Sequence, residues 1–361
     1  MKDKILLWFI PALAAGLALN SIAAIAGEQD AGVFGPIAQP VDTYSTQARD
    51  SARWGFAYDN DFFVPGGRDQ DYTYGLSMSY SNRVIEDDRW HKPLDAIDGL
   101  LGFASGSNVR YGFEGGLYGF TPEDTSVAQA NTNDRPYASL VYFSTYKERM
   151  NVKQESVLRT QLSIGVLGLE LVGQIQDETH KLIGNERPQG WDNQISSGGE
   201  PTFRYVVSMQ NKIHTGSSHF ELRQSKAASI GYLTEASWGM SFRAGKLNSS
   251  WSDFNPELAS YAESSSATVK GFSERFIWGG VAIKARGYNA FMQGQFRDSP
   301  VTIAGDDLNH AILEAWAGYT HSFASGYYIS YGVRGHSSEV RSGPANRNVV
   351  WGGLMLGKRI I

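Results

Sequence analysis

Apolar and polar residues alternate with a period of two along segments of about ten residues, and this pattern recurs from residue 53 to the C-terminus. In segment 72–81, Tyr, Leu and Met occupy the even positions, whereas Thr, Gly and Ser occupy the odd ones. The same arrangement recurs in segments 158–166, 203–210, 238–243 and 327–336. A period of two indicates strands with two different faces. The chain is therefore predicted to consist mainly of β-strands.

Two architectures produce such strands: a soluble sandwich and a transmembrane barrel. Strands of about ten residues have the length that a tilted strand needs to cross a bilayer. The polar face carries Gly, Ser, Arg and Glu, which are typical of a barrel lumen, and the apolar face is rich in Tyr, Trp and Phe, which suit the membrane interfaces. We therefore predict an all-β fold, a transmembrane antiparallel β-barrel, with a soluble β protein as the alternative.

The barrel is expected to have about twelve strands, an even number that places both chain ends in the periplasm. They are predicted near residues 53–62, 71–81, 108–118, 136–148, 156–168, 201–213, 219–231, 237–247, 274–290, 311–322, 326–340 and 348–361. The outer loops are then the first (63–70), the second (119–135), the third (169–200), the fifth (291–310) and the sixth (341–347). Long periplasmic turns, each with a short helix ("PLDAIDGLLG" and "NPELASYAES"), are predicted at 82–107 and 248–273.

The N-terminus has the features of a secretory signal peptide. Lys2 and Lys4 precede an apolar run, which ends in the small residues of "AIAG". We predict a signal peptide over 1–26, an N-terminal periplasmic segment over 27–52 and the barrel over 53–361. The alternative for the first segment is an uncleaved membrane anchor. After residue 27, no apolar run approaches the roughly 20 residues of a membrane helix.

Composition excludes several classes of function. The net charge of -5 provides no basic surface for nucleic acid. The chain has 0 Cys, which excludes disulfides, thiolate metal sites and Cys nucleophiles. It also lacks the G-x-S-x-G motif of serine lipases. We expect a monomer in the outer membrane.

Polar clusters lie where strands meet outer loops. By alternation, Asp59 and Asp61 of "YDNDFF" face inward, while Asn60 continues a lipid-facing row, where an amide is costly unless it lies above the membrane or beneath a loop. The motif "DQDYTYG" opens the adjacent strand, and "NTNDRPYA" (131–138) precedes another. Carboxylates and backbone carbonyls suit Ca²⁺. The alternative is that "YDNDFF" and "DQDYTYG" are only a polar hairpin end.

The segment "GQIQDETHKLIGNERPQGWD" (173–192) begins like a helix in a chain otherwise built from strands. Gln176 and His180 are four residues apart and therefore share one helix face. A neutral His can act as general base on water, and a nearby metal can polarise an ester carbonyl. The alternative is a solvated face of an amphipathic helix.

The motifs "DNDFF", "DQDYTYG", "TPED", "NDRPYA" and "GQIQDETHKLIGNERPQGWDNQI", in this order, resemble the lipid A 3′-O-deacylase family of Gram-negative outer membranes. The resemblance implies a twelve-stranded barrel whose active site lies outside the wall, beneath a helix from an outer loop. It also implies Ca²⁺-dependent hydrolysis of the ester that holds the 3′ acyloxyacyl chain on lipid A in the outer leaflet. An outer-membrane phospholipase, or a non-catalytic barrel for uptake or adhesion, remains an alternative.

The family's general base and metal ligands correspond to five positions here. His180 matches the base. The resemblance implies that Asp61 and Glu186, with the carbonyls of Thr73 and Gly75, hold Ca²⁺.

The family's ester-binding residues correspond to Asn60 and Gln176, which would bind or polarise the ester. Members of the family can carry a functional Lys in the second outer loop, but the only cation of "TPEDTSVAQANTNDRP" is Arg135. Arg135 is therefore the candidate for binding the substrate's polar head.

Overall fold

The computed structural model describes residues 52–64, 71–82, 89–103, 109–151, 153, 155–213, 217–255 and 273–360. The expected signal peptide (1–26) lies outside the described residues. The same holds for the segment 27–52, except for its last residue, and for nearly all of the helix predicted in "NPELASYAES".

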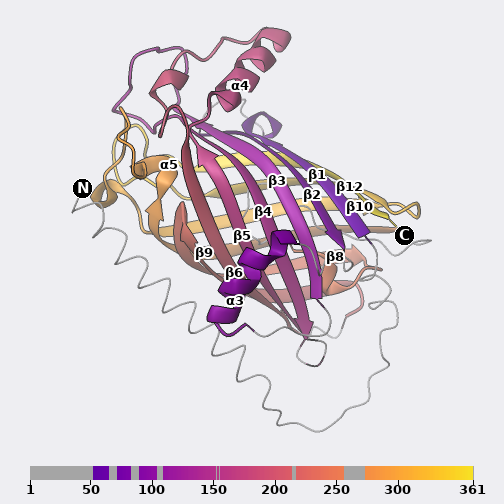
Figure 1. Ribbon diagram of the computed structural model, residues 1–361. Coiled ribbons are helices and arrows are strands. Elements are labelled where there is room, and N and C mark those ends of the chain that lie inside the picture. The colour runs from indigo at the N-terminus through magenta and orange to yellow at the C-terminus, as the bar shows by residue number, and fades with distance from the viewer. Residues whose placement is uncertain are drawn as a thin grey trace.

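Twelve strands form one closed antiparallel barrel, in which each strand pairs with its neighbours in sequence and β1 pairs with β12 (Figure 1). The strands are β1 (Ala52–Asn60), β2 (Asp71–Asn82), β3 (Val109–Thr121), β4 (Ala138–Asn151), β5 (Ser156–Leu167), β6 (Glu200–Ile213), β7 (Phe220–Gly231), β8 (Leu233–Lys246), β9 (Glu274–Asn289), β10 (Ala311–Ser322), β11 (Tyr327–His336) and β12 (Val349–Ile360). The predicted fold class and strand order are confirmed.

Two strand boundaries differ most from the prediction, the start of β8 and the end of β11. β8 begins at Leu233, so that only Tyr232, a buried residue of the barrel interior, separates it from β7. β11 ends at His336 because the chain beyond it pairs with the fifth outer loop, where the backbone N–H of Asn309 donates to the carbonyl of Glu339. In β11, these loop contacts replace the strand pairing that alternation alone predicts.

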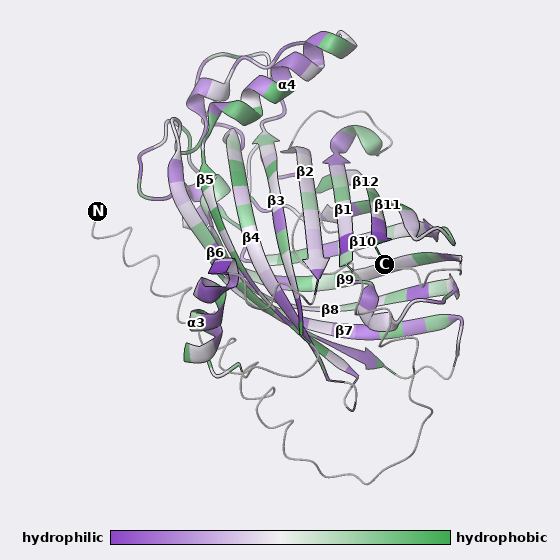
Figure 2. Cartoon of the chain, turned by 45° about the vertical axis from the view of Figure 1, so that its right-hand side comes forward, coloured by the Kyte–Doolittle hydropathy of each residue, from purple (hydrophilic) through white to green (hydrophobic). Residues whose placement is uncertain are grey.

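Hydrophilic and hydrophobic residues alternate along the strands (Figure 2), and the exposure of their side chains gives the two faces of the wall the polarity expected of a membrane barrel. Large apolar side chains such as those of Met78, Ile164 and Leu313 are exposed on the outside. The interior contains buried ion pairs, including one between Glu314 and Arg334. At its outer end the interior is filled by a cluster of mostly aromatic residues, namely Tyr72, Tyr118, Phe120, Ala138, Leu140, Tyr142, Leu167, Ile195, Tyr232, Leu233, Tyr288, Ala290, Phe291, Val349 and Trp351.

A β-bulge in β2 changes which residues face inward. The register of β2 against β3 shifts between Tyr72 and Tyr74, so Thr73 is an extra residue in the ladder. Tyr72 is fully buried in the interior cluster, 5.0 Å from the ring of Trp351, whereas Tyr74 lies on the outside beneath a loop. The prediction that Tyr72 and Tyr74 share one face was therefore wrong, because strict alternation assumes an unbroken ladder.

The helices lie outside, above and inside the wall (Figure 1). α3 (Lys92–Leu100), which confirms the helix predicted in "PLDAIDGLLG", packs its Leu94 on the outer surface of β5 and β6. α4 (Glu170–Ile183) belongs to the third outer loop. α5 (Ala290–Gln293), which the sequence analysis does not predict, inserts Phe291 into the interior cluster. None of the helices within the described ranges combines the length and apolar character needed to span a bilayer.

Short 3-10 turns complete the described elements, and two of them adjoin longer elements directly. η1 (Asp61–Phe63) continues from the end of β1, and η2 (Arg89–His91) leads into α3. The remaining turns are η3 (Trp191–Asn193), η4 (Trp251–Asp253) and η5 (Gly305–Asp307).

Candidate functional site

α4 begins and ends at residues that favour these positions. It begins with Glu170, whose charge suits the helix N-terminus, three residues before the predicted start. It ends at Ile183 and is capped by Gly184, whose φ of 76° is a left-handed conformation that glycine adopts without strain. Gln176 and His180 lie on one buried face, although their neighbours Glu178 and Lys181 are exposed. The two residues therefore do not belong to a solvated face.

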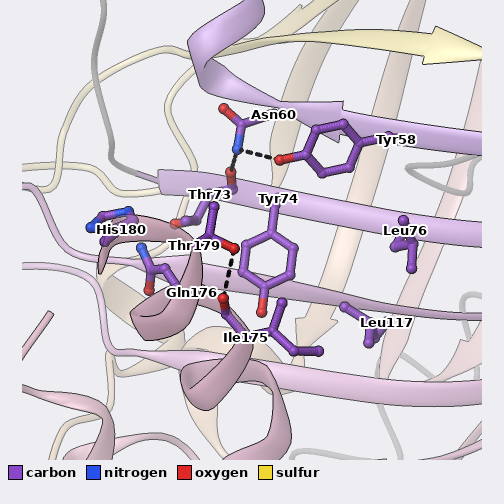
Figure 3. A pocket seen from close by; sticks show the side chains of 10 residues that line it. All are labelled: Tyr58, Asn60, Thr73, Tyr74, Leu76, Leu117, Ile175, Gln176, Thr179 and His180. Carbon is purple, nitrogen blue, oxygen red and sulfur yellow. Dashed lines mark hydrogen bonds between the residues drawn. The ribbon is translucent and has the colours of Figure 1, made fainter. Parts of the chain in front are cut away.

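A pocket of about 100 Å³ lies between α4 and the outer wall of the barrel. Figure 3 shows side chains from α4 on one side and from β1, β2 and β3 on the other. The lining residues are Tyr58, Asn60, Thr73, Tyr74, Leu76, Leu117, Ile175, Gln176, Thr179 and His180. Four of the predicted site residues, Asn60, Thr73, Gln176 and His180, are thus brought together, on the lipid-facing side of the wall.

His180 is held by the chain that returns after α4. Its Nδ1 lies 2.5 Å from the backbone carbonyl oxygen of Glu186. Because a carbonyl oxygen only accepts hydrogen bonds, Nδ1 is the donor, and in the neutral imidazole the lone pair is on Nε2. This is the tautomer required of a base that takes a proton through Nε2.

The loop that carries Glu186 is tied back to α4 by an ion pair. The guanidinium of Arg187 donates through two nitrogens to the carboxylate of Asp177. These hydrogen bonds lower the pKa of Asp177 below its usual value. The pair therefore helps to keep the Glu186 carbonyl next to His180.

Gln176 is oriented by Trp191 of η3. The Nε1 of Trp191 donates to Oε1 of Gln176 over 2.8 Å. An indole N–H is a donor only, so the amide NH₂ of Gln176 is at the opposite end of the amide group. Trp191 approaches α4 closely because Gly173 has no side chain, since a Cβ there would lie 2.7 Å from the indole ring.

Asn60 and the β2 bulge form one structural unit. The Nδ2 of Asn60 donates to the carbonyl oxygen of Thr73 over 2.7 Å, and its Oδ1 accepts from the backbone N–H of Phe62 over 2.6 Å. The amide therefore caps η1 and binds the carbonyl of the residue in the bulge. Bulges are often found beside active sites because they redirect single residues.

Tyr74 fastens α4 to the wall. Its hydroxyl donates to the backbone carbonyl of Val172, and Val172 is fully buried. The ring of Tyr74 lines the pocket together with Leu76 and Leu117. The pocket thus has a polar end at Asn60, Gln176 and His180 and an apolar end that faces the membrane.

The oxygen donors expected to hold Ca²⁺ are only partly gathered. Asp61 is buried in η1, directly after Asn60, and Thr73 presents its carbonyl at the bulge. Gly75 is buried in β2, but Glu186 is exposed and only its carbonyl contact with His180 is seen. Among the described residues, no three His, Asp or Glu side chains group as metal ligands. Carboxylate and carbonyl oxygens are the hard donors that Ca²⁺ prefers. Backbone carbonyls and water would have to supply the remaining ligands.

Arg135 lies away from the pocket. It is buried inside the outer end of the barrel, with its guanidinium 4.7 Å from the centre of the Phe120 ring. It also pairs with Asp71 at 3.4 Å. Arg347, from the sixth outer loop, binds both Asp71 and Asp134, each at 2.8 Å. The structure therefore places Arg135 in an ion-pair network beneath the loops.

Several pocket residues lie outside the set chosen from sequence. In the sequence, Tyr58, Tyr74, Leu76 and Leu117 stand out only as members of alternating strands. Trp191, which orients Gln176 but does not line the pocket, is only part of the quoted loop. The alternation shows which side of the wall a residue occupies, but not which part of the wall α4 covers. The additional lining residues are Ile175 and Thr179, which lie close to Gln176 and His180 on α4.

Comparisons with known proteins identify a family and support the barrel fold. The model of the family described as "Outer membrane protein LpxR" matches residues 17–360. LpxR from Salmonella typhimurium has a similar structure, with a TM-score of 0.68 and 17% identity, over 85% of this chain and 100% of that one. The β domain of the Bordetella autotransporter BrkA is less similar, with a TM-score of 0.40 and 9% identity over 86% and 98%. No curated protein sequence matches the chain.

Proposed function

This chain belongs to the LpxR family of outer membrane proteins, and we propose that it is a lipid A deacylase that hydrolyses the ester holding the 3′-linked acyloxyacyl chain. The observation that carries the proposal is the pocket in which Asn60, Thr73, Gln176 and His180 meet on the lipid-facing side of the wall. A lipid ester reaches such a pocket laterally from the outer leaflet. Lipid A and lipopolysaccharide are the lipids of that leaflet that the family resemblance implies.

His180 would act as the general base. Its Nδ1 donates to the Glu186 carbonyl, so Nε2 is the atom that takes a proton from water. The water then attacks the ester carbonyl, and the protonated imidazole returns the proton to the leaving alkoxide. This scheme uses no covalent nucleophile.

Gln176 would stabilise the negative charge that develops on the ester oxygen. Because Trp191 occupies its Oε1, its NH₂ is the end that can donate to the oxyanion. Asn60 keeps the bulge in place through the Thr73 carbonyl and lines the same pocket. A fixed donor contributes more than a mobile one, because it needs no reorganisation during the reaction.

Asp61 and Glu186, with the carbonyls of Thr73 and Gly75, are the proposed ligands of Ca²⁺. When bound, the ion would polarise the ester carbonyl as a Lewis acid. The support is the oxygen chemistry of Asp61 and of the bulge beside the pocket.

The test uses the purified full-length barrel in detergent with Ca²⁺, lipid A and a mixture of glycerophospholipids. Mass spectrometry is expected to show loss of one acyloxyacyl group from lipid A. His180→Ala should lower the rate by a factor of about 10² to 10⁴. His219→Ala, which removes an exposed His in a periplasmic turn, is the matched control. Hydrolysis of the glycerophospholipids alone would favour a phospholipase, and unchanged lipids would contradict both.

A further inference from the structure

The lipid-facing wall continues below the pocket as rows of outward side chains. Residues opposite each other on antiparallel strands share a face. The first row contains Leu76 and Leu117, which line the pocket. In the next row, Met78 lies opposite Gly115, and Gly115 lies opposite Phe143.

Gly115 leaves a gap in this second row. Met78 and Phe143 are 63% and 42% exposed, so both project outward on either side of it. A Cβ added at Gly115 would have no neighbour closer than 3.7 Å, which is ordinary contact distance. The position therefore does not need glycine for backbone reasons, and a larger side chain would project into the gap.

The gap is closed on the periplasmic side by η2. Phe113, two residues from Gly115 on β3, stacks on Phe143 with ring centroids 5.7 Å apart. His91 packs on Phe113 at 4.6 Å, and Trp90 packs on Phe143 at 5.9 Å. From Leu117 to Phe113, the open stretch along β3 is about 13 Å long.

We propose that this stretch of wall is an acyl-chain subsite that extends from the pocket over Gly115 and ends at Trp90. It would hold the fatty chain of the ester whose carbonyl lies at His180, and its length would set the preferred chain length. The inference rests on the proposed function, because the continuity between this stretch of wall and the pocket identifies the occupant. The residues of the subsite are apolar, as an acyl chain requires.

The experiment compares Gly115→Leu with wild type on a mixture of lipid A species whose 3′-linked chains increase in length. Leu at position 115 would fill the gap, so the ratio of long-chain to short-chain hydrolysis should fall about tenfold or more. Trp90→Ala should shift the ratio in the opposite direction. Ala315→Leu places the same side chain at an exposed position of β10 and serves as the matched control.

Each result has a defined meaning. If wild type and Gly115→Leu hydrolyse all species in equal ratios, the subsite is overturned while the deacylase function stands. If wild type hydrolyses no lipid A, the proposed function fails, and native mass spectrometry of lipid A bound to the same variants tests the subsite. Lower retention of long-chain lipid A by Gly115→Leu than by Ala315→Leu would support it, and equal retention would overturn it.

Discussion

The imidazole of His180 donates from Nδ1 to the backbone carbonyl oxygen of Glu186. The contact uses the main chain of Glu186, whose side chain is exposed. Orientation of His180, the proposed base, is therefore separable from any metal binding by the Glu186 carboxylate. The family resemblance assigns Glu186 only to metal binding, and the structure adds the contact of its carbonyl with His180.

Glu186→Ala tests this separation. The variant keeps the carbonyl that orients His180, so at saturating Ca²⁺ it should retain most of the wild-type rate. If the carboxylate is a metal ligand, the Ca²⁺ concentration for half-maximal rate should rise. The measurement is the rate of lipid A deacylation over a Ca²⁺ titration. If Glu186→Ala is inactive at every Ca²⁺ concentration, as expected for His180→Ala, Glu186 does not act on His180 through its carbonyl alone.

Trp191→Phe should lower kcat more than it changes KM. The variant keeps an aromatic ring near Gly173 but removes the N–H that fixes Oε1 of Gln176. Loss of one such hydrogen bond is worth about 1 kcal/mol, which corresponds to about a fivefold decrease in rate. The control is Tyr137→Phe, which keeps the ring that contacts Trp191 at 5.0 Å. Equal kinetics in the two variants would mean that Trp191 does not act through Gln176.

The fold was predictable because a period of two needs no tertiary information. All twelve strands appear near their predicted positions, and the outer loop with its helix follows from their order. The bulge at Thr73 was not predictable, since aromatic residues at both 72 and 74 suit an unbroken strand equally well. The start of β8 and the end of β11 adjoin backbone hydrogen bonds to segments distant in sequence, from Tyr232 to Phe203 and from Asn309 to Glu339.

The candidate site was partly predictable. The spacing of Gln176 and His180 places them on one helix face, and family resemblance connects them with Asn60 and Thr73. The location of Arg135 depends on closure of the barrel, because its neighbours Asp71 and Glu339 come from the start of β2 and from the chain after β11. A cation in a loop can bind substrate or carboxylates of the same protein, and its sequence alone does not distinguish these roles.

Asp61→Asn should weaken the response to Ca²⁺ more strongly than Glu186→Ala does. Asp61 is buried beside the bulge, so its carboxylate has the more favourable position for a hard cation. Chelator should abolish wild-type activity, and added Ca²⁺ should restore it. Thermal unfolding with and without Ca²⁺ provides a readout that is independent of activity. A Ca²⁺-dependent shift in Tm of equal size in Asp61→Asn and wild type would exclude Asp61 as a ligand.

Arg347→Ala should loosen the outer loops around the pocket. Its guanidinium binds Asp71, at the start of β2, and Asp134, in the second outer loop. Removing this partly buried guanidinium should cost about 1–3 kcal/mol, because Asp134 loses its ion-pair partner whereas Asp71 keeps Arg135. We expect faster proteolysis of the outer loops and a lower deacylation rate, with the barrel intact by heat-modifiable gel migration. Arg341→Ala, in the same loop, is the control. Proteolysis at the wild-type rate would show that the ion pairs of Arg347 do not hold the outer loops in place.

Asp177→Asn should make the segment 184–190 less protected against hydrogen exchange. The hydrogen bonds from Arg187 lower the pKa of Asp177, so the pair stabilises the loop fully above about pH 4, the usual carboxylate value. The stabilisation is lost only as pH falls through the lowered pKa. The difference between wild type and variant should therefore persist at neutral pH and disappear in strong acid, and salt should reduce it because the pair is exposed. Glu178→Gln changes the neighbouring carboxylate, which pairs with Lys181 at 3.5 Å. Equal exchange in both variants at neutral pH would show that the Asp177–Arg187 pair does not hold the Glu186 carbonyl in place.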